Sequence, residues 1–536
     1  MQLVAYGAQD IYLTGNPQIT FWKVTYRRHT NFAMESIEQT FNGAADFGRR
    51  VTCTISRNGD LAYRTYLQVT LPEIGQSLGT VALPDVYARW LDFPGHQLID
   101  DVEVEIGGQR IDKQYGDWMQ IWNQLTLDKN QERGYNKMVG QTTQLTFLTD
   151  PDFADVDGPC DSSAPRQVCA PRNALPETTL YVPLQFWFCQ NPGLALPLIA
   201  LQYHEVKINI DLRAIDECLF AVSSLSATAS DQKVTGAYAQ SLVAASLYVD
   251  YVYLDTDERR RMAQNPHEYL IEQLQYTGAE SVGSSSNKIR LNFNHPCKEL
   301  IWVVQPDCNV DYCSSLTGGT TLYNALGAQP FNFTDAIDAL PNTIRAFGSD
   351  EQTGAGAAGD KGGSNSFINA SGLFQEANAN AVSNAFGEDA GTQGWQGLGG
   401  NTTTSGVSDA GTFVLAETSL DMHCWGENPV VTAKLQLNGQ DRFSEREGTY
   451  FDQVQPWQHH TRAPDTGINV YSFALRPEEH QPSGTCNFSR IDNATLQLVL
   501  SNATVTGTNT AKVRVYARNY NVLRIMSGMG GLAYSN

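Results

Sequence analysis

The sequence is poor in charged residues and in long apolar runs. Only 17% of its 536 residues are charged. No stretch approaches the roughly 20 consecutive apolar residues that a membrane-spanning helix needs. The first residues lack the charged start and the apolar centre of a signal peptide, so we expect the chain to be made and kept in the cytosol. Because 36 basic residues stand against 57 acidic ones, the net charge is −21, and we expect no direct nucleic-acid binding.

Cysteine is scarce as well. The ten cysteines are irregularly spaced and form no CxxC pair, which is the usual mark of zinc or redox sites. Buried free thiols are therefore the expected state. Cys160 with Cys169, and Cys308 with Cys313, are near enough along the chain to close a loop disulfide, and spacing alone leaves that alternative open.

Motifs for catalysis or metal binding are missing. The nine histidines show no HExxH or similar spacing, and no GxSxG elbow occurs. His459 and His460 would point to opposite sides of an extended strand and so share no metal. The GxGxxG string at 354–359 follows no strand pattern, which argues against a dinucleotide site. We expect no cofactor, no metal and no enzymatic activity, while a carboxylate pair formed in space stays open.

The sequence is rich in period-two alternation of apolar and polar residues, the pattern of strands with one face toward water. The apolar members of these runs are Val51, Cys53 and Ile55; Leu67, Val69 and Leu71; Val102, Val104 and Ile106; Val206, Ile208, Ile210 and Leu212; Ala433, Leu435 and Leu437; Ala494, Leu496 and Leu498; and Val513, Val515 and Ala517. The pairs Asn58-Gly59, Gly107-Gly108 and Asn438-Gly439 predict tight turns with positive φ. Together these features favour antiparallel sandwiches over a parallel α/β sheet.

The two halves of the chain resemble each other weakly. Residues 105–111 parallel residues 436–443, with one residue inserted in the second copy. Farther on, residues 181–210 and 471–498 share the order of strand, Pro/Gly turn and strand. Since 536 residues suffice for two large β-domains, the repeat predicts two copies of one β-domain. The charged, helix-favouring segment 254–264 lies between them and indicates the boundary.

Several long strings carry a resemblance to a known family. They are MQLVAYGAQDIYLTGNPQITFWKVTYRRHTNFAMES, ISRNGDL, DVEVEIGGQRIDK, NPGLALPLIALQYHEVKI, LDTDERRRMAQNPHEYLIEQLQ, LQLNGQDRF, QPSGTCNFSRIDNATL and NYNVLRIMSGMGGLAY. In this order, the chain closely resembles the major capsid proteins of nucleocytoplasmic large DNA viruses, above all those of algal viruses in the phycodnavirus group. It departs from them mainly at 141–177 and at about 307–417, which look like enlarged surface loops.

The resemblance implies an all-β fold, a double jelly roll of two consecutive eight-stranded antiparallel sandwiches with long surface loops. It implies the following division: 1–28, an N-terminal arm toward the inner capsid face; 29–254, the first jelly roll; 255–268, a linker; and 269–536, the second jelly roll with large insertions at about 307–417. Such a chain trimerises into pseudo-hexagonal capsomers of an icosahedral shell. Its implied places are the virion capsid and, during synthesis and assembly, the host cytoplasm.

The resemblance also implies partners: neighbouring capsomers, minor capsid and penton proteins, and host surfaces met by second-domain loops. The candidate contacts with minor capsid proteins are Tyr6, Tyr12, Phe21, Trp22, Tyr26, Arg27 and Arg28. An equal alternative is that these aromatic side chains enter the first sandwich. Family members often carry glycans on outer loops, so the candidate glycosylation sites are Asn332, Asn369 and Asn401, each in a sequon.

A second function stays in view on the residues alone. Jelly rolls also host lectins and glycosidases, so a glycan-binding or glycan-hydrolysing sandwich is the alternative, with Trp395 as a ring for sugar stacking. A minor capsid or penton protein is a nearer competitor, but such proteins resemble a single jelly roll.

Overall fold

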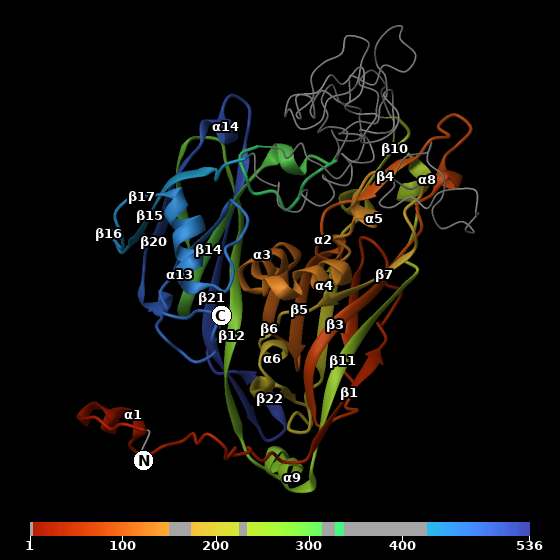
Figure 1. Ribbon diagram of the computed structural model, residues 1–536. Coiled ribbons are helices and arrows are strands. Elements are labelled where there is room, and N and C mark those ends of the chain that lie inside the picture. Colours follow the sequence, from red (N-terminus) through yellow and green to blue (C-terminus); the bar gives the residue numbers. More distant parts are fainter. Residues whose placement is uncertain (1–3, 150–172, 225–232, 313–326, 337–425, 536) are drawn as a thin grey trace.

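The computed structural model describes residues 4–149, 173–224, 233–312, 327–336 and 426–535. Two β-sandwiches stand side by side, with the N-terminal arm and a short charged helix at one end (Figure 1). No helix in the described part of the chain is long and apolar enough to cross a membrane.

The first sandwich packs two antiparallel sheets face to face. Its strands are β1 (Phe32–Gln39), β2 (Arg50–Thr54), β3 (Leu61–Leu71), β5 (Ile99–Ile106), β6 (Gln109–Tyr115), β7 (Thr178–Pro183), β8 (Leu196–Pro197), β9 (Val206–Leu212) and β11 (Ala244–Leu254). One sheet has the order β1-β11-β3-β7, with β8 beside β3, and the other has the order β2-β9-β5-β6. A separate two-stranded sheet pairs β4 (Tyr87–Trp90) with β10 (Leu219–Val222).

The second sandwich repeats this plan. Its strands are β12 (His267–Val282), β13 (Ser286–Leu291), β14 (Pro296–Pro306), β15 (Val430–Leu437), β16 (Gln440–Asp441), β17 (Arg446–Glu447), β18 (Ile468–Ser472), β19 (Cys486–Asn487), β20 (Ala494–Leu500), β21 (Ala511–Met526) and β22 (Met529–Leu532). One sheet has the order β12-β21-β14-β18, with β19 beside β14 and β22 beside β21. The other has the order β13-β20-β15-β16, with β17 beside β15.

The strand order is identical in the two sandwiches. We number the eight strands on the main path of the two sheets in chain order within each sandwich and call them the principal strands. They are β1, β2, β3, β5, β6, β7, β9 and β11 in the first sandwich, and β12, β13, β14, β15, β16, β18, β20 and β21 in the second. In both sandwiches one sheet has the order first-eighth-third-sixth and the other has the order second-seventh-fourth-fifth. This confirms the predicted all-β double jelly roll. The similar segments of the sequence occupy equivalent strands, since 105–111 lies on β5 and β6 and 436–443 lies mostly on β15 and β16.

Helices are short and occupy the connections. The α-helices are α1 (Ile11–Thr14), α2 (Pro94–Leu98), α3 (Gly116–Thr126), α4 (Lys129–Val139), α5 (Thr143–Thr146), α6 (Trp187–Gln190), α7 (Ile215–Cys218), α8 (Thr235–Tyr238), α9 (Thr256–Gln264), α13 (Gln455–His459) and α14 (Asn502–Val505). The 3-10 turns are η1 (Ala8–Asp10), η2 (Gln76–Leu78), η3 (Pro192–Leu194), η4 (Asp307–Val310) and η9 (Phe488–Arg490), and η8 (Tyr450–Val454) is a π-helical turn. Between the sandwiches, Asp255 caps α9 by accepting hydrogen bonds from Asp257 N and Glu258 N.

Two of the three predicted turns are hairpins with positive φ. Gly107 and Gly108 join β5 to β6, and Asn438 and Gly439 join β15 to β16. The expectation for Gly59 was wrong, because β2 and β3 belong to different sheets and Gly59 has no positive φ. A Cβ at Gly59 would instead lie 2.7 Å from Cβ of Tyr251, so close packing requires the glycine.

The predicted inward residues form the cores of the two sandwiches, and almost all of those positions are buried. The acidic residues that alternate with them on β5 are not in water as expected. Asp101 pairs with Lys113 at 2.9 Å, and Glu103 pairs with Arg50 at 2.8 Å. Lys113 comes from the neighbouring strand β6, and Arg50 comes from β2, which lies beyond β9 in the same sheet, so cross-strand pairing holds these carboxylates out of bulk solvent.

Candidate functional site: the junction of the sandwiches and the exposed surfaces

A helix of the first sandwich makes the junction with the second. Helix α3 follows β6 and lies against the outward face of sheet β12-β21-β14-β18 (Figure 1). Trp118 and Trp122 stand one turn apart on α3, are almost fully buried, and pack with Ile301 and Tyr516. The ring centroids of Trp118 and Tyr516 are 5.4 Å apart. This apolar cluster is separate from both sandwich cores and fixes the two sandwiches to each other.

The start of α3 explains why the helix sits there. A Cβ at Gly116 would lie 2.2 Å and 2.3 Å from two carbonyl oxygens, so only glycine permits this close turn after β6. Asp117 in the first helical turn pairs with Arg213 of the first sandwich and Arg514 of the second, each at 3.4 Å. Burial disfavours the charge, but the two guanidinium groups outweigh it and hold the pKa of Asp117 below its usual value.

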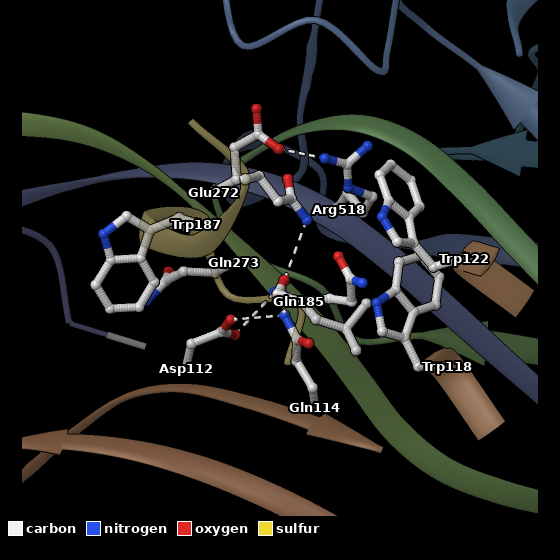
Figure 2. A pocket seen from close by; sticks show the side chains of 11 residues that line it. Asp112, Gln114, Trp118, Trp122, Gln185, Trp187, Glu272, Gln273 and Arg518 are labelled. Atoms are coloured by element: carbon white, nitrogen blue, oxygen red, sulfur yellow. Dashed lines mark hydrogen bonds and ion pairs between the residues drawn. The ribbon is translucent and has the colours of Figure 1, made fainter. Parts of the chain in front are cut away.

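A small polar pocket opens at this junction. Figure 2 shows Trp118, Trp122 and Trp187 around it, with polar side chains from both sandwiches between them. Asp112 accepts hydrogen bonds from Leu274 N at 3.1 Å and from its neighbour Lys113 N at 3.0 Å. Burial raises the pKa of Asp112 to about 7 in spite of these bonds. The bond from Leu274 N ties β12 of the second sandwich to β6 of the first, which makes this carboxylate a structural link.

Beside the pocket lies a buried charge cluster, which we define as Glu272, Lys298, Glu299, His460 and Arg518. Arg518 pairs with Glu272 and, at 3.0 Å, with Glu299. Lys298 donates to Glu272 at 2.7 Å, and His460 Nε2 lies 2.9 Å from Glu299. The guanidinium of Arg518 also stacks over the Trp122 ring at 3.9 Å, so the cluster touches the helix of the first sandwich.

The protonation states of the charge cluster follow from its geometry. Burial would raise the pKa of Glu299, but His460 and Arg518 hold it at about 2. Burial would lower the pKa of His460, but Glu299 and Glu478 raise it to about 9. His460 is thus a buried cation at neutral pH.

The expectation of an extended strand at 459–460 was wrong, because His459 is the last residue of α13.

The C-terminal hairpin adds a second tie between the sandwiches. Strand β22 folds back along β21 and reaches the first sandwich. Tyr203 N donates to the Gly528 carbonyl at 3.0 Å, Gly530 N donates to His204 Nδ1 at 3.1 Å, and Leu532 N donates to Gln109 Oε1 at 3.3 Å. The junction is therefore secured on both the helix side and the hairpin side.

The predicted arm residues lie on the segment before β1, which is without regular structure apart from η1 and α1. The side chains of its aromatic candidates are 74–103% exposed, and Arg27 and Arg28 are exposed as well. None of these aromatic residues enters the first sandwich. They are Tyr6, Tyr12, Phe21, Trp22 and Tyr26. The arm runs past α9 at one end of the molecule (Figure 1), and its aromatic side chains are left exposed in the described part of the chain.

Only one glycosylation candidate lies in the described part of the chain. The amide nitrogen of Asn332 donates to Gln329 Oε1 at 2.8 Å and to the Ala336 carbonyl at 3.0 Å, while Thr334 donates to its oxygen. A glycan on Asn332 would replace one of the two amide hydrogens, so at least one of these donations would be lost. Asn369, Asn401, Trp395 and the 354–359 string lie outside the described residues.

The cysteines and possible ligand groups were also located. Cys53, Cys189, Cys218 and Cys297 are buried and free, whereas Cys308 is free and exposed. Cys160, Cys169 and Cys313 lie outside the described residues. Within the described ranges no group of three or more His, Cys, Asp and Glu side chains is placed to hold a metal ion.

Comparison with known proteins identifies the family. The model "Major capsid protein N-terminus" matches residues 20–255, and "Large eukaryotic DNA virus major capsid protein" matches residues 258–531. The chain belongs to the major capsid proteins of large eukaryotic DNA viruses. This capsid protein is a structural component of the virion shell, not an enzyme, as predicted.

The relatives confirm the predicted link to algal viruses. This capsid protein is 78% identical to the major capsid protein of Phaeocystis pouchetii virus over 536 residues, covering 100% of this chain and 99% of the relative. It is 72% identical to that of Chrysochromulina ericina virus over 582 residues, with the same coverage. The "PBCV-1 virus capsid, quasi-atomic model" matches with a TM-score of 0.59 and 34% identity, covering 96% of this chain and all of that one.

Sequence reasoning missed the junction of the capsid protein. The pair Trp118 and Trp122, four residues apart after a predicted strand, was a signal for a helix with one apolar face. The charge cluster had no local signal, because Glu299 and Arg518 meet from positions 219 residues apart. Long-range pairing of this kind becomes visible only when the sheet order is known.

Proposed function

We propose that three copies of this chain form a capsomer of pseudo-hexagonal outline, and that such capsomers tile an icosahedral shell. The observation that carries the proposal is the junction, which fixes two sandwiches of one strand order within each chain. Each chain thus presents two near-equivalent blocks, and repeated head-to-tail contacts between blocks can close into a ring. Neighbouring capsomers and penton proteins would meet the outside of that ring.

The domain division follows the same proposal. Residues 29–254 and 269–536 are the two blocks, and residues 255–268 connect them. We propose that the insertions at about 307–417 contact host surfaces. Residues 1–28 are the inward arm.

Solution mass tests the capsomer. We expect light scattering on the size-exclusion peak of the full chain to give three times 59.0 kDa, and negative-stain images to show hexagonal outlines. A stable monomer at micromolar concentration would refute the trimer and would revive the glycan-binding alternative, to be followed by glycan-affinity assays.

We propose that the arm binds a minor capsid protein through its exposed aromatic side chains, with Arg27 and Arg28 facing acidic groups. Exposed aromatic and Arg side chains are the residue types that dominate protein interfaces. Deleting residues 1–28 should leave trimers intact but prevent particle assembly with minor proteins. The matched control is Val81→Ala, since Val81 is as exposed as the arm residues but lies on the first sandwich. Normal particles from the deleted chain would exclude this role.

We also propose that outer-loop glycans are carried at Asn369 and Asn401 rather than at Asn332, whose amide nitrogen already makes two hydrogen bonds. The intact mass of the virion protein should exceed the bare-chain mass, and glycopeptide mapping should find Asn332 unmodified. A bare-chain mass would eliminate glycosylation altogether.

A further inference from the structure

The junction within the chain defines a contact between two types of surface. One is the helix that follows the fifth principal strand of a sandwich, here α3 after β6. The other is the outward face of the first-eighth-third-sixth sheet of the next sandwich, here β12-β21-β14-β18. Trp118 and Trp122 supply the apolar side chains of the helix, and Tyr276 stacked on Tyr516 at 4.8 Å forms part of the sheet face.

The same two surface types occur once more in the chain. In the second sandwich, α13 is the helix between the fifth and sixth principal strands. It presents Trp457, whose side chain is 79% exposed, with Val454 one turn earlier. Leu475 is 76% exposed and lies beside α13, since His459 Nδ1 is 3.1 Å from the Leu475 carbonyl. We call Val454, Trp457 and Leu475 the Trp457 patch.

The complementary sheet face is the outward side of β1-β11-β3-β7 in the first sandwich. Tyr66 and Tyr248 stand opposite each other in neighbouring strands and stack at 5.4 Å, and Tyr181 lies 6.2 Å from Tyr66 on the far side. We call Tyr66, Tyr181 and Tyr248 the tyrosine face. Both sandwiches carry an outward tyrosine on the eighth strand, Tyr248 on β11 and Tyr516 on β21. Its stacking partner differs, because Tyr248 stacks on Tyr66 of the third strand and Tyr516 stacks on Tyr276 of the first strand.

We infer that the Trp457 patch of one copy docks on the tyrosine face of a second copy of this chain. The inference rests on the proposed trimer and adds the residues that close it. Within the described residues, neither surface packs against another sandwich, and each resembles one side of the contact that the chain makes internally, so a second copy supplies the missing side. The contact is heterologous, and repetition of one such contact closes a ring.

The charges around the two surfaces are of both signs. Beside the tyrosine face, Glu38 and Asp250 point outward on β1 and β11. Beside the Trp457 patch, Arg476 is exposed and Arg446 stacks over the Tyr450 ring at 4.3 Å. Arg476 is paired with Glu479 at 3.0 Å, and Arg64 is exposed on β3 two residues before Tyr66, so the aromatic side chains rather than the charges carry this pairing.

Solution mass of variants tests the contact. We expect Trp457→Ala to raise the concentration at which trimers dissociate by roughly 30-fold or more, the effect of losing an interface hot spot. Tyr66→Ala with Tyr248→Ala should do the same, whereas Trp457→Phe should retain most of the trimer. Trp22→Ala is the matched control, because Trp22 is 81% exposed on the arm and has no part in this contact. Far-ultraviolet circular dichroism of each variant verifies that its sandwiches are folded.

Photocrosslinking locates the occupant directly. With p-benzoylphenylalanine in place of Trp457, we expect crosslinks between chains to peptides within 61–71, 178–183 or 244–254. Two results together would overturn the inference but not the proposed trimer: the Trp457→Ala variant still forms trimers, and position 457 crosslinks to other peptides. A wild-type chain that stays monomeric would overturn the proposed trimer itself. Crosslinks to a different protein in infected cells would assign the Trp457 patch to that protein and refute docking on a second copy.

Discussion

Replacing Glu299 by Gln tests the charge cluster most sharply. The Glu299 side chain is fully buried between two cations, with Arg518 at 3.0 Å and His460 at 2.9 Å. Glu299→Gln keeps the shape but leaves both cations buried without their shared carboxylate. Removing one partner of a buried ion pair costs about 3–5 kcal/mol. In a domain of this size each kcal/mol shifts Tm by about 2–4 °C, so Tm should fall by roughly 6–20 °C.

The matched control is Glu268→Gln on β12, a strand of the same sheet as β14, which carries Glu299. Glu268 pairs with Arg524 at 2.8 Å, but both side chains are about half exposed, so the loss should stay below about 1 kcal/mol. Calorimetry at pH 7 and at equal chain concentration compares the two variants with the wild type, since oligomer formation makes Tm depend on concentration. Equal Tm shifts for Glu299→Gln and Glu268→Gln would refute the claim that the buried network stabilises the second sandwich.

Three further measurements extend these arguments. The pKa of His460 is about 9 in the folded chain against 6.5 in the unfolded chain, so its contribution to stability is complete below pH 6.5 and is lost as pH rises through 9. Scanning calorimetry should show the wild type losing roughly 3 kcal/mol more stability than His460→Gln across that window. Parallel pH profiles of the two proteins would contradict this. Gly59→Ala should lower Tm because its Cβ would clash with Tyr251, whereas Gly134→Ala, in the open interior of α4, should raise stability by about 0.5–1 kcal/mol; equal shifts in thermal unfolding would disprove the packing argument. Truncation after Met526 removes β22 and should increase hydrogen exchange at Tyr203, which would stay protected if the hairpin were not a tie between the sandwiches.

Local patterns in the sequence predicted seven of the strands and a duplicated β-domain, whereas the double jelly roll was predicted from the family resemblance. Alternation placed Val102, Val104 and Ile106 inward because a strand turns successive side chains to opposite faces, and all three are buried. Periodicity could not predict the fate of the intervening Glu103, because that depends on Arg50 and Lys113 from other strands. The same limit hid the charge cluster, which forms only after distant strands pair.

The surfaces between sandwiches were predictable only in part. Exposed aromatic residues such as Trp22 were predicted from the family resemblance, whereas the place of Trp118 at the junction was not predicted. A tryptophan in a sequence does not reveal whether it fills a core, a junction or an outer surface. Trp118 and Trp457 differ in this respect although they occupy equivalent connections, because only one of them has a second sandwich in its own chain to cover it.

The covalent connection through α9 has a consequence for how assembly responds to dilution. Contacts between the first and second sandwiches of one chain form at an effective concentration set by a nine-residue helix and its flanks, not by the amount of protein in solution. In a ring of three chains, half of the contacts between sandwiches would therefore be immune to dilution. Formation of such a three-chain capsomer would depend on the third power of protein concentration, whereas a capsomer of six separate sandwiches would depend on the sixth.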